Sequence, residues 1–292
     1  MSDNSRDGEA GGCHEKSDCD REAKAVQNGR IVDPPDQPLL NAQRFVVHQY
    51  DHQEYRRIIH QGGEWYAWDG TCWRVLEYGQ LRAQLYEFFG EAIYQGAHGQ
   101  REFAPTKRKV DDLMDALRAI AHLPVAINSP SWLAGARALP PGEIVACANG
   151  LVHVPTRAIH SHTPAVYGHH AVSFNFHPAP SAPIRWLNFL RELWGDDGES
   201  IETLQELFGH LVSSDTRQQK LFLIVGPKRS GKGTIARVIT AMLGQHNVVG
   251  PTLAGLGTNF GLSPLIGKPV AIISDARLGH MTDGSVVTER LL

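Results

Sequence analysis

The residues from Gly226 to Thr234 have the types and spacing that bind phosphate groups. They lie in the stretch LFLIVGPKRSGKGTIARVIT, residues 221–240. Gly226-x-x-x-x-Gly231-Lys232 is the spacing of a phosphate-binding loop, a motif that needs a strand before it and a helix after it. Glycines let the backbone turn its N–H groups toward a phosphate chain, while the helix N-terminus and the lysine add positive charge. We therefore predict that a nucleoside triphosphate binds here, in contact with Gly226, Pro227, Lys228, Arg229, Ser230, Gly231, Lys232, Gly233 and Thr234.

The residues on either side of this loop have the required patterns. Five apolar residues, 221–225, predict a buried strand, and Ile235, Val238, Ile239 and Met242 share one face of the helix that follows. In many such loops a Ser or Thr directly after the lysine holds Mg²⁺. Here that position is Gly233, and the hydroxyl comes one residue later. Thr234 either binds Mg²⁺ or bonds a phosphate oxygen while water completes the metal shell, and the sequence leaves both open.

A second candidate group lies in VAIISDAR, residues 270–277. An apolar run that ends in Asp275 is the pattern of a buried parallel strand with a carboxylate at its C-terminal end. Such a carboxylate lies beside the phosphate site, where it can hold Mg²⁺ or its waters. The next residue is Ala276, where many ATPases have an acid that polarises the attacking water. We therefore expect that another residue has that role, or that hydrolysis is slow.

Composition and length limit the class of protein. With 292 residues, the chain has room for two domains. It is 42% hydrophobic and 20% charged, and no apolar run reaches the length of a membrane span. The net charge of -3 gives no global nucleic-acid signature, so any DNA contact needs a local basic surface. The four cysteines fit no zinc spacing, and the acidic, polar N-terminus is not a secretory signal. We expect a cytoplasmic protein with reduced thiols and no membrane partner.

The chain divides into three predicted parts. Residues 1–38 are polar and predict a disordered tail. Residues 39–180 predict an α+β domain, and the proline-rich HPAPSAP at 177–183 marks its end. Residues 181–292 predict the nucleotide-binding domain. Helical spacing of apolar residues predicts helices over 41–48, 81–94, 106–123, 184–194 and 200–212.

Two segments of the α+β part allow a structural and a functional interpretation. In the hairpin pattern of residues 57–76, the turn signal Asp69-Gly70 follows closely spaced aromatics that can stack nucleic-acid bases. We favour the structural interpretation, in which these aromatics pair across strands. A second hairpin is predicted around Asn149-Gly150. Six histidines at positions 153, 160, 162, 169, 170 and 177 can be imagined as metal ligands, but surface and loop histidines are the better interpretation.

Beyond these patterns, the sequence resembles a known family. The runs LQELFGHLVSSDTRQQKLFLIVGPKRSGKGTIARVITAMLG and FGLSPLIGKPVAIISDARL are similar to the superfamily 3 helicase domain of phage and plasmid primase-helicases. EWYAWDGTCWRVL, ANGLVHV and FHPAPSAPIRWLNFLRELW resemble the region that precedes this domain in the poxvirus and phage-satellite type. The resemblance covers about residues 40–292.

This resemblance implies an ATP- and Mg²⁺-dependent DNA helicase that assembles as a ring, usually a hexamer, on single-stranded DNA during replication. By position, Lys232 would contact the β- and γ-phosphates, Thr234 would assist the metal, and Asp275 would be the Walker B carboxylate, so that Lys232 and Asp275 are the catalytic candidates. The implied fold is an α/β P-loop NTPase (AAA+-like) with a parallel sheet, preceded by an α+β accessory domain.

The sequence differs from the family pattern after Asp275. The family continues through a further DNA-facing motif, a sensor asparagine and an arginine finger, whereas this sequence stops at Leu292. We therefore expect an incomplete sheet, a truncated chain and impaired hydrolysis.

Two other functions remain as alternatives. Gly231-Lys232-Gly233-Thr234 also resembles the loop of adenylate kinases, which suggests a P-loop nucleotide kinase. However, those enzymes have the loop near the N-terminus and an arginine-rich lid after it. The second alternative is a non-catalytic DNA-binding or assembly module formed by residues 40–180.

Overall fold

The computed structural model describes residues 29–52, 55–133, 139–213 and 221–274. It divides into two compact units. The first unit comprises Met1–Ala67 and Val75–Val125, and the second comprises Trp68–Arg74 and Ala126–Leu292. Each unit has its own apolar core.

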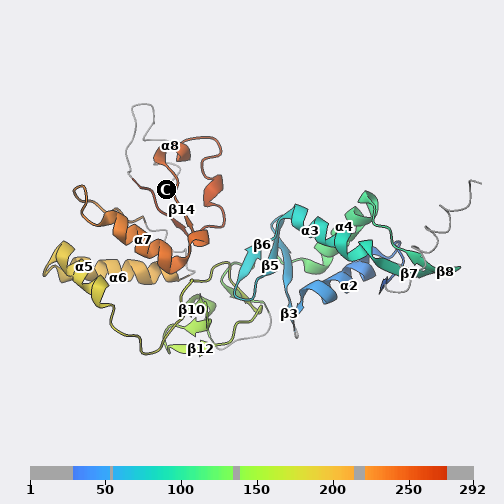
Figure 1. Cartoon of the computed structure of the whole chain (residues 1–292), viewed down its shortest axis with the longest axis horizontal. Helices are drawn as coiled ribbons and strands as arrows, with labels where there is room; N and C mark the ends of the chain where they lie inside the picture. Colours follow the sequence, from blue (N-terminus) through green and yellow to red (C-terminus); the bar gives the residue numbers. More distant parts are fainter. Residues whose placement is uncertain (1–28, 53–54, 134–138, 214–220, 275–292) are drawn as a thin grey trace, which may run out of the picture. The chain divides into compact units, whose positions relative to one another are not determined.

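The described part of the first unit contains three helices: α2 (Pro38–Tyr50), α3 (Tyr78–Gly90) and α4 (Lys107–Ala121) (Figure 1). Helix α4 begins where the Thr106 side chain accepts a hydrogen bond from the backbone N–H of Lys109, a regular N-cap. Five of its apolar residues recur at helical spacing and are buried: Val110, Leu113, Met114, Leu117 and Ala121. The helix expected over residues 106–123 is therefore confirmed. Its apolar face packs into one core with α2 and α3 that contains Phe45, Leu81, Leu85, Phe89, Leu113 and Leu117.

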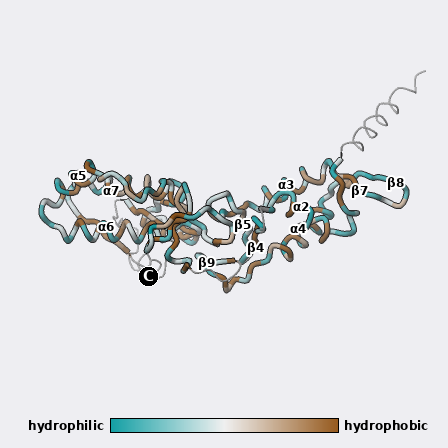
Figure 2. The backbone as a smooth tube through the Cα atoms, turned by 90° about the horizontal axis from the view of Figure 1, so that it is seen from below, coloured by the Kyte–Doolittle hydropathy of each residue, from teal (hydrophilic) through white to brown (hydrophobic). Residues whose placement is uncertain are grey.

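The helix expected over residues 81–94 is shorter than its pattern. Helix α3 ends at Gly90, and the next residues form strand β7 (Ala92–Gly96). This strand lies between β1 (Arg30–Val32), with which it is parallel, and β8 (Gly99–Glu102), with which it is antiparallel. Figure 2 shows β8 as a largely hydrophilic strand, in agreement with its exposed residues. Strand β1 also shows that regular structure begins inside the range 1–38, for which we expect a disordered tail; residues 1–28 lie outside the described residues.

Further strands follow α2 in the chain. Strands β2 (Asp51–His52) and β3 (Tyr55–Arg56) form a short antiparallel pair. Strands β4 (Ile58–Gln61), β5 (Glu64–Trp68) and β6 (Trp73–Val75) form a sheet in that order. Trp65 is buried in the core of the first unit, which favours the structural interpretation of this aromatic cluster.

The turn between β5 and β6 is held by the carboxylate of Asp69, as its Asp-Gly pattern predicts. This carboxylate accepts hydrogen bonds from the N–H groups of Thr71 and Cys72, from the Thr71 hydroxyl and from the Arg74 guanidinium, at 2.7–3.1 Å. Gly70 follows it with φ of 106°, a conformation that suits glycine. Residues 68–74 belong to the second unit.

Acid is expected to weaken this turn. Burial by itself raises the pKa of Asp69, but the hydrogen bonds from Cys72, Thr71 and Arg74 outweigh it and lower the pKa from 3.8 to about 2. Because the folded-state pKa is the lower one, ionised Asp69 stabilises the fold above about pH 4, and this contribution is lost as the pH falls toward about 2. Urea unfolding midpoints measured at both ends of that pH range test this. Between the higher and the lower pH, we expect the midpoint of Asp69→Asn to fall less than that of the unaltered protein. Equal losses would contradict it, and Asp112→Asn, an exposed carboxylate on α4, is the control.

The second unit contains a three-stranded antiparallel sheet of β10 (Ile144–Cys147), β11 (Gly150–His153) and β12 (Ala158–His160). The hairpin expected at Asn149-Gly150 is confirmed, since Cys147 pairs with Gly150 in register. The short 3-10 helix η1 (Pro141–Glu143) precedes β10, and β9 (Ser131–Trp132) pairs with β13 (Val166–Tyr167).

The next three helices that the structure describes in the second unit are α5 (Ile184–Trp194), α6 (Gly198–Val212) and α7 (Lys232–Leu243) (Figure 1). Helix α5 has the predicted bounds, and α6 begins where Asp197 accepts a hydrogen bond from the N–H of Ser200 at 3.1 Å. Residues from β10 and β11 share one core with all three helices, including Val145, Val152, Leu190, Leu204, Ile235 and Ile239. Residues before and after position 180, where we expect a domain boundary, therefore pack into the same core.

After α7 the chain is mostly irregular. It contains η2 (Gln245–Asn247), β14 (Val248–Val249), α8 (Leu253–Leu256), η3 (Ser263–Leu265) and β15 (Val270–Ala271). Strands β14 and β15 are parallel, with Val248 opposite Val270. This two-stranded pair is the only parallel pairing that the structure describes in the second unit.

The buried strand expected over residues 221–225 is not formed. These residues form no strand, and their side chains are between 39% and 82% exposed. A strand in a parallel sheet is held by hydrogen bonds along its edges and covered on both faces. None of the described strands pairs with this apolar run, so it lacks the sheet that would bury it. Residue 275 lies outside the described residues, so the predicted place of Asp275 stays a prediction.

Candidate phosphate-binding site

The loop before α7 turns sharply just ahead of the helix. Arg229 and Gly231 both have positive φ, 64° and 80°, and α7 begins at Lys232 directly after them. A helix leaves its first N–H groups without partners inside the helix, and its dipole gives this end a partial positive charge. The structure therefore brings the loop from Gly226 to Gly231 and the N-terminus of α7 together.

The Lys232 ammonium lies inside the loop. Its Nζ donates hydrogen bonds to the carbonyl oxygens of Gly226 and Pro227, both at 2.7 Å, and to Oγ of Ser230 at 3.2 Å. The three N–H donors of an ammonium are thus directed at three acceptors of the same loop. A phosphate oxygen can replace these acceptors as a charge-assisted partner.

Gly231 is the point where the loop touches α5. A β-carbon on Gly231 would lie 2.9 Å from Cζ of Phe189 and 3.0 Å from Cδ2 of Leu193. Its positive φ is a second reason for glycine at this position. Helix α5 therefore packs directly against the loop, a contact between residues far apart in the sequence.

Thr234 faces a cation. Its Oγ1 accepts a hydrogen bond from the Arg237 guanidinium at 3.0 Å, one turn along α7. The hydroxyl keeps its own O–H, which can donate to a phosphate oxygen, and a second lone pair, which can bind a metal. Of the two predicted Mg²⁺ ligands, only Thr234 lies among the described residues.

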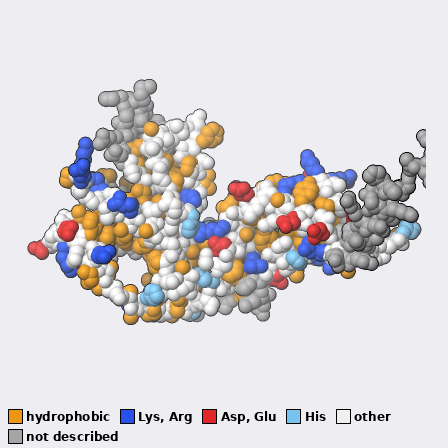
Figure 3. Space-filling model, viewed as in Figure 1, with side chains coloured by type: hydrophobic (Ala, Val, Ile, Leu, Met, Phe, Trp, Pro, Cys, Tyr) orange, Lys and Arg blue, Asp and Glu red, His pale blue; other side chains and the backbone are white. Residues whose placement is uncertain are grey.

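A cleft of about 490 Å³ lies between the loop, α7 and α5. One side is formed by the loop and the first turns of α7, and the other by α5; it is lined by Phe189, Glu192, Leu193, Arg229, Gly231, Gly233, Thr234 and Arg237. Figure 3 shows Lys and Arg side chains gathered on the face over α5 and α7, where Arg185, Arg191, Lys228, Arg229 and Arg237 are exposed. The volume is within the range of about 300–1,000 Å³ that is typical of small-molecule sites.

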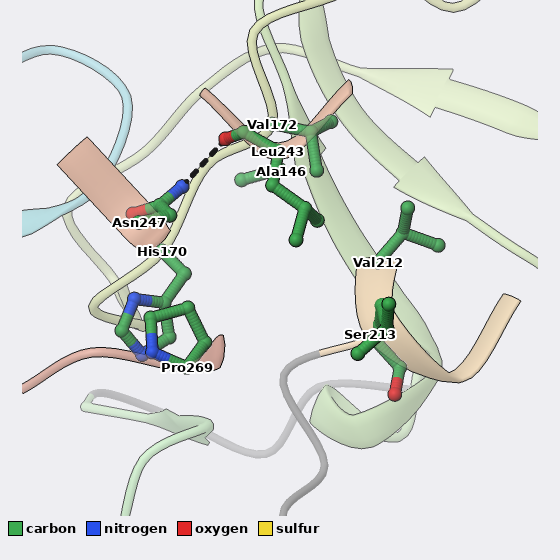
Figure 4. A pocket seen from close by; sticks show the side chains of 9 residues that line it. Ala146, His170, Val172, Val212, Ser213, Leu243, Asn247 and Pro269 are labelled. Atoms are coloured by element: carbon green, nitrogen blue, oxygen red, sulfur yellow. Dashed lines mark hydrogen bonds between the residues drawn. The ribbon is translucent and has the colours of Figure 1, made fainter. Parts of the chain in front are cut away.

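A second, enclosed cavity is much smaller. It measures about 10 Å³ and is lined by residues that include His170, Val172, Leu243 and Asn247 (Figure 4). The Asn247 amide donates a hydrogen bond to the Leu243 carbonyl oxygen at 2.8 Å. Burial, with a smaller contribution from nearby cationic groups, lowers the pKa of His170 to about 4. A cavity of this volume has room for about one water molecule, so it is too small to bind a nucleotide.

The histidines of residues 153–177 differ partly from the surface positions that we expect. His153 is buried, with Nδ1 at 2.7 Å from the Thr156 hydroxyl and Nε2 at 3.0 Å from the Glu143 carboxylate. His169 and His170 are also largely covered, and burial lowers the pKa of both. Within the described ranges, no group of three or more His, Cys, Asp or Glu side chains has the arrangement of a metal site.

Sequence patterns find the loop but not its surroundings. The motif indicates residues 226–234 because its signal is local. Arg237 lies three residues after Thr234, so helical spacing alone would have placed the two side by side. By contrast, no sequence signal indicates that Phe189, Glu192 and Leu193 of α5 line the same cleft.

Comparison with known proteins identifies the family. The family model described as "D5 N terminal like" matches residues 43–195, more than half of the chain. This model is found in phage and viral primase-helicases. The chain therefore belongs to the D5 N-terminal-like family. A search of curated proteins found no match. Among the described residues, no helix is both long and apolar enough to span a membrane.

Proposed function

We propose that this protein binds ATP with Mg²⁺ at residues 226–234 and acts as a helicase component in phage or plasmid DNA replication. The observation that carries the proposal is the Lys232 ammonium, held inside a loop of phosphate-binding spacing at the N-terminus of a 12-residue helix. Family membership supports the replication context, because the family is associated with primase-helicases. In this proposal the fold around the loop is an AAA+-like P-loop NTPase.

Each residue has a stated task in the proposal. Lys232 binds the β- and γ-phosphate oxygens, and the loop N–H groups orient the phosphate chain. Thr234 and Asp275 hold Mg²⁺, which supplies charge neutralisation when bound. Arg237, already bonded to Thr234, adds a second cation beside the phosphates. Single-stranded DNA as the partner and assembly as a homo-oligomeric ring, a hexamer in the similar helicases, belong to the same proposal.

Calorimetric titration of the full chain with Mg-ATP tests it. We expect one site per chain with a dissociation constant in the range of about 1 μM to 1 mM, typical of enzyme substrates. AMP, which has neither a β- nor a γ-phosphate, is expected to bind much more weakly and is the control. Absence of heat with about 5 mM Mg-ATP would overturn the proposal, as would AMP binding as tightly as ATP. Sedimentation with single-stranded DNA, with and without Mg-ATP, tests the ring and its partner.

A further inference from the structure

Helix α5 forms the wall of the cleft that faces the phosphate loop, and its chemistry differs from that of the loop. On the loop side the charged groups are the cations Arg229 and Arg237. On the α5 side the lining residues are Phe189, Leu193 and the acid Glu192. A carboxylate repels phosphate groups, so the α5 wall is unsuited to the triphosphate. It suits a flat, neutral group that carries N–H donors.

The ring of Phe189 is held in place by stacking on neighbouring aromatic rings. It stacks on Trp186 with centroids 5.4 Å apart and an interplanar angle of 28°. Trp186 in turn stacks on Phe208 of α6 at 5.6 Å and 24°. These three rings bring a rigid aromatic surface to Gly231 of the loop, where Phe189 lies against the backbone. A wall that is already ordered loses little conformational entropy when a ligand binds.

We propose that the α5 wall is the nucleobase subsite of the phosphate-binding cleft and prefers a purine that carries an exocyclic amine. Phe189 and Leu193 contact the apolar surface of the base, and the Glu192 carboxylate accepts a hydrogen bond from the amine. Uracil has no such amine, and its smaller ring covers less of the apolar wall. This inference rests on the proposed function, because the phosphates must be bound by the loop for the base to reach α5.

The test compares Mg-ATP, Mg-UTP and magnesium tripolyphosphate on the full chain by calorimetry. Tripolyphosphate reports the loop alone, and the nucleotides report the loop and the base together. We expect ATP to bind about tenfold more tightly than UTP. We expect Glu192→Ala to weaken ATP about tenfold, the scale of one lost hydrogen bond to a charged group, while tripolyphosphate binds as tightly as before or more tightly. Glu206→Ala, an exposed acid on α6, is the matched control and is expected to change neither.

Each other outcome contradicts a definite part of the argument. Equal affinity for ATP and UTP would overturn the subsite, as would Glu192→Ala strengthening ATP and tripolyphosphate by the same factor, the result expected of a neighbouring charge. In both cases the loop still binds phosphate, so the proposed function stands. If neither ATP nor tripolyphosphate binds, the proposed function fails and the subsite with it. Because Glu192 is exposed on α5, the variant is expected to keep its fold, which circular dichroism checks.

Discussion

Lys232→Ala is expected to weaken Mg-ATP binding by about 10- to 100-fold, the range of one or two hydrogen bonds to a charged group. The ammonium is the group that the structure directs into the loop, with its three donors aimed at Gly226, Pro227 and Ser230. When phosphate enters, these donors turn to its oxygens, and alanine has nothing to replace them. Tripolyphosphate is expected to lose affinity by the same factor, because Lys232 acts on the phosphates and not on the base. Isothermal calorimetry of both ligands measures the effect.

The matched control for this prediction is Lys228→Ala. It removes the same charge from the same loop, but Lys228 is exposed. An exposed charge is screened by solvent, so we expect a loss of less than about threefold. Equal losses in the two variants would mean that the loop attracts phosphate only by its general charge. In the Lys232→Ala variant, water can bond to the oxygen atoms that accept hydrogen bonds from the Lys232 ammonium, because these contacts are exposed. The free energy of unfolding is therefore expected to change little.

The part of the site that could be predicted from sequence is the part whose cause is local. Gly226, Gly231 and Lys232 act through backbone conformation and the start of one helix, all within a few residues. The N-cap of α4 and the turn at Asp69-Gly70 have the same local origin, because each is held by a side chain that bonds the backbone of its own segment. The turn at Asn149-Gly150 also has a distant contact, because the Asn149 side chain bonds the backbone of Phe176 at 2.8 and 3.0 Å.

What could not be predicted depends on contacts between distant segments. The apolar run 221–225 has the composition of a buried strand, but burial needs neighbours, and none of the described strands pairs with it. A histidine in a polar segment is expected at the surface. His153 is nevertheless buried, because Glu143 and Thr156 give both of its ring nitrogens a hydrogen-bond partner. The position of Glu192 in the cleft follows from packing of α5 on Gly231, which no pattern in either segment shows.

Trp73→Ala is expected to destabilise the second unit by about 3–5 kcal/mol, the usual cost of removing a fully buried tryptophan. Trp73 has no exposed surface. Its backbone N–H donates to the Gly168 carbonyl oxygen at 2.8 Å, and its ring N–H lies 3.1 Å from the Val166 carbonyl oxygen and 3.3 Å from that of Pro164. The ring also meets Tyr167 edge-on at 6.1 Å. Alanine at position 73 leaves a cavity in place of the ring, and it removes the ring N–H from the carbonyl oxygens of Pro164 and Val166.

Trp73→Phe separates the loss of packing from the loss of the hydrogen bond of the ring N–H. It keeps most of the packed ring and removes the ring N–H, so we expect a smaller loss, about 1–3 kcal/mol, for the two carbonyl oxygens left without a donor. Urea unfolding followed by circular dichroism gives the free energies. Hydrogen exchange of the peptides covering residues 158–176 tells whether the loss is local to the Trp73 contacts. Phe260→Ala, at a position 85% exposed, controls for loss of an aromatic ring and is expected to change stability by less than about 0.5 kcal/mol. If Trp73→Ala costs no more than this control, residues 68–74 are not packed on the second unit as the structure describes.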